Sequence, residues 1–126
     1  METLEMRFLK MGLAALGALT VASTGIAADR DLSGKYAMEG TSLRPNFRPY
    51  GGECVLKRSA WIYQVNCVNT GSGDKYVGKG IQRGDLFSLY LGEYLVVYRV
   101  AVNGKLDGDW AHARSDDYGR ESLMPK

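Results

Sequence analysis

Residues 86–114 alternate between apolar and other side chains, and this rhythm constrains the fold more than any other feature of the sequence. The segment reads LFSLYLGEYLVVYRVAVNGKLDGDWAHAR and is dominated by the strand-forming residues Val, Tyr, Phe and Trp. A period of two sends successive side chains to opposite faces of a strand, whereas a helical face repeats about every 3.6 residues. The segment is therefore predicted to be an antiparallel meander of three strands.

A glycine turn predicts how the first two of these strands pair. Gly92 followed by Glu93 suits a two-residue type II′ hairpin loop, because the first loop residue of that turn has a positive φ. The resulting pairs are Leu91 with Tyr94, Leu89 with Val96 and Phe87 with Tyr98. All six side chains are expected on one face of the sheet.

The second turn contains Gly104 and allows two registers. A two-residue loop would place apolar residues on the face that carries Asp107 and Asp109, because a one-residue slip exchanges the two faces. A three-residue loop over residues 102–104, with Gly104 in the left-handed conformation, avoids this conflict and is preferred. Its pairs are Val100 with Leu106, Tyr98 with Gly108, Val96 with Trp110, and Arg99 with Asp107, the last expected to form an ion pair on the outer face.

Five further strands are expected outside the meander. They cover residues 34–40, 53–57, 61–68, 76–82 and 120–123. In the third of these, Trp61, Tyr63, Val65 and Cys67 alternate onto one face. In the fourth, Gly78 and Gly80 share a face and leave room for large side chains across the sheet.

Residues 41–52 are expected to form an irregular, exposed and basic loop. They contain Arg44-Pro45 and Arg48-Pro49. Each proline fixes its own backbone and disfavours helix in the arginine before it.

Eight short strands with no amphipathic helical window indicate an all-β fold. An antiparallel up-and-down barrel of about eight strands leaves no exposed sheet edge, and its interior is filled or holds one small ligand. A flattened β-sandwich is the alternative.

Residues 1–28 have the features of a cleaved signal peptide. Arg7 and Lys10 form a basic start, residues 11–22 are uncharged and mostly apolar, and residues 25–28 supply small side chains for cleavage. The apolar run is too short for a stable membrane span, and the true start is either Met1 or Met6. A single domain is thus expected over residues 29–126, located in the periplasm or secreted.

The charge and cysteine content fit such an exported domain. The formal net charge of the chain is only +2 and no basic cluster is present, so nucleic acid is not an expected partner. The two cysteines, Cys54 and Cys67, are expected to pair in an oxidising compartment. A hairpin with a four-residue loop would set them directly opposite each other. Metal binding by two cysteines without a nearby histidine is the weaker interpretation.

Two resemblances to known families are present. The run from Gly78 to Leu123, with Tyr98-Arg-Val, Gly104-Lys-Leu-Asp-Gly-Asp-Trp and Gly119-Arg-Glu-Ser-Leu, resembles small exported β-proteins of Gram-negative bacteria, mostly uncharacterised and some labelled fibronectin-binding. The run Leu32-Ser-Gly-Lys-Tyr, with Glu53-Cys-Val-Leu, is similar to the start of the periplasmic alkaline-protease inhibitors. That family implies an eight-stranded barrel with one disulfide, whose segment before the first strand, here residues 29–33, blocks a protease cleft.

The sequence offers few residues for catalysis. His112 is the only histidine, so it is the only candidate general base and cannot build a multi-histidine metal centre. No nucleophile motif accompanies it, and a packed histidine near a barrel rim is the preferred interpretation. Asp107 and Asp109 lack the ligand order of an EF-hand and are expected on a solvated outer face. Neither a catalytic site, a metal site nor a cofactor is predicted.

Binding residues are easier to nominate. The strand pairing gathers Tyr76, Leu91, Tyr94 and His112 at one end of the barrel, which would be the mouth of a small-ligand site. The predicted ligand-binding residues are Tyr76, Tyr94, Trp110 and His112, although core packing is the preferred interpretation for Trp61, Tyr98 and Trp110. Arg44, Arg48 and the turn tripeptide Arg83-Gly84-Asp85, which matches an adhesion motif, are the candidates for protein contacts.

The function expected from these observations is an exported, non-enzymatic binding protein that acts through protein–protein contacts as an inhibitor or adhesin, with a secreted or surface protein as its partner. A small-ligand-binding barrel of the lipocalin or avidin kind is the first alternative. A small hydrolase is the second.

Overall fold

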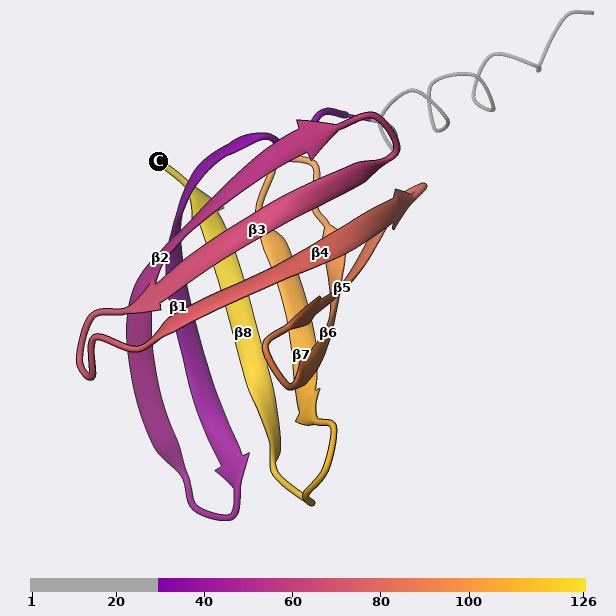
Figure 1. The fold of residues 1–126 in the computed structure, drawn as a ribbon. Helices are drawn as coiled ribbons and strands as arrows, with labels where there is room; N and C mark the ends of the chain where they lie inside the picture. Colours follow the sequence, from indigo (N-terminus) through magenta and orange to yellow (C-terminus); the bar gives the residue numbers. More distant parts are fainter. Residues whose placement is uncertain (1–29) are drawn as a thin grey trace, which may run out of the picture.

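The computed structural model describes residues 30–126, which form a closed antiparallel barrel of eight strands (Figure 1). Each strand pairs with the next one along the chain, and the last pairs with the first. The strands are β1 (Gly34–Arg44), β2 (Arg48–Ser59), β3 (Ile62–Asn69), β4 (Lys75–Arg83), β5 (Leu86–Leu91), β6 (Tyr94–Val100), β7 (Leu106–His112) and β8 (Tyr118–Pro125). The predicted up-and-down barrel is confirmed over the sandwich, while the signal peptide of residues 1–28 lies outside the described residues.

The predicted register of the meander is confirmed. Leu91 pairs with Tyr94 across the turn at Gly92, whose φ of 62° is the positive value that a type II′ loop needs. At the second turn the backbone N–H of Ala101 donates to the Lys105 carbonyl, which closes a three-residue loop, and Gly104 has a φ of 89°. The predicted ion pair between Arg99 and Asp107 is wrong. Arg99 lies opposite Asp107 but forms its ion pair with Asp85, at 2.6 Å, because the β4–β5 turn brings this carboxylate closer.

The prediction of an irregular basic loop over residues 41–52 is wrong. β1 continues to Arg44 and β2 begins at Arg48, so only residues 45–47 connect them. Residues that precede a proline favour extended backbone, and a strand satisfies this preference as well as a loop does. Pro49 itself pairs with Thr41 inside the sheet. The two arginines thus flank a tight turn at one end of the barrel.

The β2–β3 hairpin is also tighter than predicted. Ser59 pairs with Ile62, which leaves a two-residue turn instead of four, and Trp61 in that turn is 88% exposed instead of packed in the core. The inward alternation holds from Tyr63 onward. It sets Cys54 directly opposite Cys67, and the predicted disulfide is present.

The barrel interior is filled by side chains at its middle. Gly80 lies opposite Leu89, and a Cβ on this glycine would come within 2.8 Å of the Phe87 ring, so the predicted space for bulky neighbours is used. The largest fully buried side chains are Tyr98, Phe87, Leu32, Leu56, Leu106 and Leu123.

The segment that precedes β1 closes one end of the barrel, which we call the base. Leu32 is 1% exposed; its backbone N–H donates to the Tyr63 hydroxyl, and its carbonyl accepts from the Tyr36 hydroxyl. Arg30 donates to the carbonyl oxygen of Val102 in the β6–β7 loop. The base is therefore sealed by the protein's own chain. No helix within residues 30–126 is long and apolar enough to cross a bilayer.

Candidate functional site

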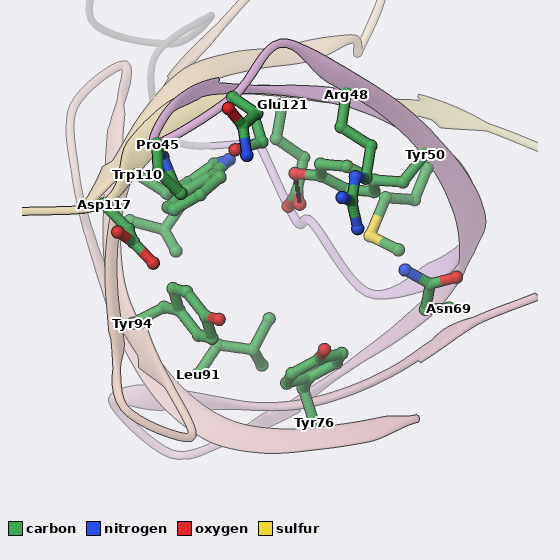
Figure 2. A pocket seen from close by; sticks show the side chains of 14 residues that line it. Pro45, Arg48, Tyr50, Asn69, Tyr76, Leu91, Tyr94, Trp110, Asp117 and Glu121 are labelled. Carbon is green, nitrogen blue, oxygen red and sulfur yellow. Dashed lines mark hydrogen bonds between the residues drawn. The ribbon is translucent and has the colours of Figure 1, made fainter. Parts of the chain in front are cut away.

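The opposite end of the barrel contains a cavity of about 400 Å³, which we call the mouth cavity. Its rim includes the β1–β2 turn at Pro45, the end of β3 at Asn69 and the β7–β8 loop at Asp117 (Figure 2). Its wall is formed by inward-facing side chains of the strands. Apart from tyrosines, three ionisable side chains of the described residues 30–126 line it: Arg48, Asp117 and Glu121.

Aromatic rings form one side of the mouth cavity. Tyr94 is in edge-to-face contact with Tyr76, at 5.9 Å between ring centroids, and with Trp110, at 5.2 Å. The three residues belong to β4, β6 and β7 and meet because Tyr94 and Trp110 lie on adjacent strands. In Figure 2 the Tyr76 and Tyr94 side chains project into the open space. The structure thus gathers three of the predicted ligand-binding residues around one cavity.

His112, the fourth predicted ligand-binding residue, lies behind Tyr94 at 5.0 Å between ring centroids and does not line the cavity. Its Nδ1 accepts a hydrogen bond from the backbone N–H of Arg114, and its Nε2 lies 3.3 Å from a carboxylate oxygen of Glu93. Both ring nitrogens are therefore engaged in contacts with residues at the rim of the barrel. His112 supports Tyr94 and is not placed to act on a molecule in the cavity.

A carboxyl group that the sequence reasoning missed lies deep in the mouth cavity. Glu121 on β8 is only 7% exposed. Its Oε1 accepts a hydrogen bond from the Tyr50 hydroxyl at 2.8 Å, and its Oε2 accepts one from the Tyr98 hydroxyl. Each carboxylate oxygen thus has one tyrosine donor, which is the partnership that a buried charge requires.

Two glycines make this arrangement possible. Across five adjacent strands one row of the barrel reads Tyr50 on β2, Gly40 on β1, Glu121 on β8, Gly108 on β7 and Tyr98 on β6. A Cβ on Gly40 would collide with the Tyr50 ring, and one on Gly108 would come within 2.8 Å of the Tyr98 ring. Because neither glycine has a side chain, both tyrosines can reach over to the carboxyl group between them.

Burial and mutual interaction set the acidities of this row. Desolvation raises the pKa of Glu121 above its ordinary value, although the hydroxyls of Tyr98 and Tyr50 act in the opposite direction. Desolvation, followed by the Glu121 charge, raises the pKa of Tyr98 and of Tyr50. Both tyrosines therefore stay protonated and keep donating to the carboxylate.

Trp110 adds a polar group to the same region. Its ring lies over Gly119, where a Cβ would come within 2.7 Å of the indole. Its Nε1 is buried and has no well-formed hydrogen bond within residues 30–126, although it is near enough to the Tyr50 hydroxyl to act against the desolvation that raises the pKa of Tyr50. A ligand acceptor in the cavity would give this N–H a full partner.

The residues proposed for protein contacts are distributed between the two ends of the barrel. Arg48 lines the mouth cavity and is exposed, while Arg44 lies 3.6 Å from the carboxylate of Asp116. Arg83, Gly84 and Asp85 lie at the β4–β5 turn on the base end, where the Asp85 carboxylate pairs with Arg99. The structure therefore does not bring the two groups together.

Glu121 could have been found from the strand alternation. It has the same inward parity as Leu123 and Gly119, but the sequence predicts a strand only over residues 120–123, whereas β8 spans Tyr118–Pro125. Within residues 30–126, no group of three or more His, Cys, Asp or Glu side chains is arranged to hold a metal ion.

Comparison with known proteins gives no family for this chain. No protein-family model matches it, and no curated protein is significantly similar to it. The two resemblances drawn from the sequence therefore stay predictions.

Proposed function

We propose that the protein is an exported, non-enzymatic binding protein that holds a small molecule in the mouth cavity. The observation that supports this most is the cavity itself, about 400 Å³ in volume, with aromatic walls and the buried carboxyl group of Glu121. Small-molecule sites are typically about 300–1,000 Å³ and combine apolar walls with a few fixed polar groups. Export is supported by the Cys54–Cys67 disulfide and by the N-terminal sequence.

Small-molecule binding is favoured over the inhibitor and adhesion functions because the segment before β1 and the adhesion-like turn have partners within the chain. Leu32 is packed inside the barrel, and Arg30 holds the β6–β7 loop. These contacts seal the base instead of leaving a segment free to enter a protease cleft. The Asp85 carboxylate of the adhesion-like turn is already paired with Arg99.

A binding role is also favoured over a hydrolase. His112, the general base expected from the sequence, uses both ring nitrogens in contacts with Arg114 and Glu93 at the rim. A general base must come within hydrogen-bond reach of the proton that it removes. Any molecule in the cavity would be separated from His112 by Tyr94.

Tryptophan fluorescence gives a direct test. The chain has two tryptophans, and Trp61→Phe removes the exposed one, so Trp110 in the cavity becomes the only reporter. A library of small cationic, anionic and neutral aromatic fragments is titrated into this variant. We expect some fragments to change the Trp110 emission saturably and to lose this effect in Tyr94→Ala.

Tyr90→Ala is the matched control, because Tyr90 lies on the outer face of β5 and is 48% exposed. It should leave fragment binding unchanged. The proposal fails if no fragment changes the Trp110 emission or the NMR signals of the cavity residues. It also fails if binding persists in Tyr94→Ala.

A further inference from the structure

We propose that the ligand of the mouth cavity is a small organic cation, an amine or quaternary ammonium group on an apolar body, held among the rings of Tyr76, Tyr94 and Trp110 with Glu121 as its counter-charge. This inference rests on the proposed small-molecule function and specifies the chemistry of the ligand. Two observations support it, the geometry of the rings and the carboxyl groups around them; the exposed position of Arg48 limits the effect of the opposing charge.

The rings are arranged as walls and not as a stack. The interplanar angle is 78° between Tyr94 and Tyr76 and 87° between Tyr94 and Trp110. Rings that meet near right angles enclose a corner, and electron-rich rings around such a corner attract a cation within about 6 Å of their centroids. A flat aromatic ligand would instead be favoured by parallel rings with a slot between them.

Within residues 30–126, carboxyl groups outnumber cationic groups in the lining of the mouth cavity, with Asp117 and Glu121 against Arg48. Glu121 is buried, and in low-dielectric surroundings its interaction with an opposite charge is stronger than at the surface. Desolvation is the main cause that raises the pKa of Tyr76 and of Tyr94; the side chains other than tyrosine that add to it are Asp74 and Glu121 for Tyr76, and Asp117, Glu93 and Asp74 for Tyr94. All are carboxylates. A cation that enters this space would therefore compensate the buried charge of Glu121.

Among residues 30–126, Arg48 is the one cationic side chain that lines the cavity, and it supports the opposing hypothesis of an anionic ligand. It is exposed on β2 at the rim, and its side chain makes no ion pair or hydrogen bond within residues 30–126. Solvent screens such a charge, whereas Glu121 lies behind it in the interior. The structure thus favours Glu121 as the group that selects the ligand, with Arg48 opposing the entry of a cation.

Three probes of nearly equal shape separate the hypotheses. Choline carries a quaternary ammonium, 3,3-dimethylbutan-1-ol is its neutral isostere, and 3,3-dimethylbutanoate has the same apolar head with a carboxylate. Binding is measured by NMR shift changes and by Trp110 emission in the Trp61→Phe variant. We expect choline to bind at least about tenfold more tightly than the neutral isostere, the factor that corresponds to a desolvated cation–π contact with a counter-charge.

Two charge variants test the assignment of the counter-charge. Glu121→Gln keeps the shape and removes the charge; its amide oxygen can accept from one tyrosine hydroxyl, and its NH2 can donate to the other. It should weaken choline binding at least about tenfold while leaving the neutral isostere unchanged. Arg48→Gln removes an exposed charge and should strengthen choline binding. The comparison of choline with its isostere in the unaltered cavity needs no Glu121 variant, so the test holds even if that variant folds poorly.

Each result decides the inference. It is overturned, and small-molecule binding kept, if the alcohol or the carboxylate probe binds as tightly as choline, or if Arg48→Gln abolishes the binding of whichever probe binds best. If no probe and no fragment of the wider library binds, the proposed function falls with it.

Discussion

Removal of the Tyr98 hydroxyl tests the physical basis of the site. Tyr98 is 1% exposed and its hydroxyl donates to Oε2 of Glu121. Tyr98→Phe keeps the ring, which stacks on Phe87 at 6.2 Å between centroids, but leaves this buried carboxylate oxygen without a donor. Hydrogen bonds to charged groups contribute about 1.5–3 kcal/mol. We therefore expect the free energy of unfolding at neutral pH to fall by that amount.

The loss should be large enough to measure by urea denaturation followed by circular dichroism. For a domain of this size about 1 kcal/mol changes Tm by roughly 4–8 °C, so Tm should fall by at least about 6 °C. In a Glu121→Gln background, Tyr98→Phe breaks only a neutral hydrogen bond and should cost about 0.5–1.5 kcal/mol. Tyr90→Phe, which removes an exposed hydroxyl, is the control and should change stability by less than about 0.5 kcal/mol.

The cost should also depend on pH with a definite sign. Desolvation raises the pKa of Glu121 in the folded protein, so its protonated form is favoured by folding. The stability linked to this group is complete below its unfolded pKa and is lost as pH rises through the higher folded pKa. The cost of Tyr98→Phe should accordingly shrink as pH falls from neutral through the folded pKa. If that cost were the same at every pH, with Glu121 intact and in the Glu121→Gln background alike, the assignment of a buried carboxylate at neutral pH would be refuted.

Three further changes probe the base, the disulfide and the core. Leu32→Ala should destabilise the fold by about 2–5 kcal/mol in urea denaturation, because Leu32 is buried at the base. Reduction of Cys54–Cys67 should lower stability by roughly 3 kcal/mol, since the bond closes a loop with a sequence separation of 13; unfolding with and without reductant measures this. Gly80→Ala should cost about 1–3 kcal/mol in thermal unfolding, because its Cβ would overlap the Phe87 ring.

Matched changes keep these expectations refutable. Val102→Ala, at a side chain that is 93% exposed, should leave stability unchanged, and an equal loss at Leu32 and Val102 would show that the base is not packed. Gly51→Ala has space, since the nearest atom to its Cβ is 3.5 Å away, and a cost equal to that of Gly80→Ala would contradict the steric explanation. A reduced protein as stable as the oxidised one would remove the role given to the disulfide.

The sequence predicts the back half of the barrel well because turns determine pairing there. Gly92 and Gly104 each need a positive φ, and together with the alternation around Tyr98 they leave one register that buries the apolar face. The pairing of Cys54 with Cys67 follows from the same reasoning in the front hairpin, even though the turn is shorter than predicted. In the meander and in the front hairpin, the residues of the turn and the alternation beside it were sufficient to predict the strand pairing.

The candidate site was only half predicted, because it depends on contacts between distant strands. Tyr76, Tyr94 and Trp110 could be placed at one end by counting along neighbouring hairpins. The contact of Tyr50 with Glu121 joins residues 71 positions apart, across a pairing that no turn specifies. Prolines on either side of Arg48 are also consistent with a loop. The sequence therefore did not indicate that Arg48 lies on a strand and lines the cavity.

The barrel has one junction unlike the other seven. β1 and β8 pair although they lie at opposite ends of the described chain, and Lys126 donates its backbone N–H to Lys35 there. Closing so long a loop has a high entropic cost and is slow. The β1–β8 pairing should therefore form last during folding, and its amides should exchange first in hydrogen-exchange measurements. Tyr50 and Glu121 face each other from either side of it. A ligand that contacts both residues would hold β1 and β8 together. Its binding should slow amide hydrogen exchange along these two strands.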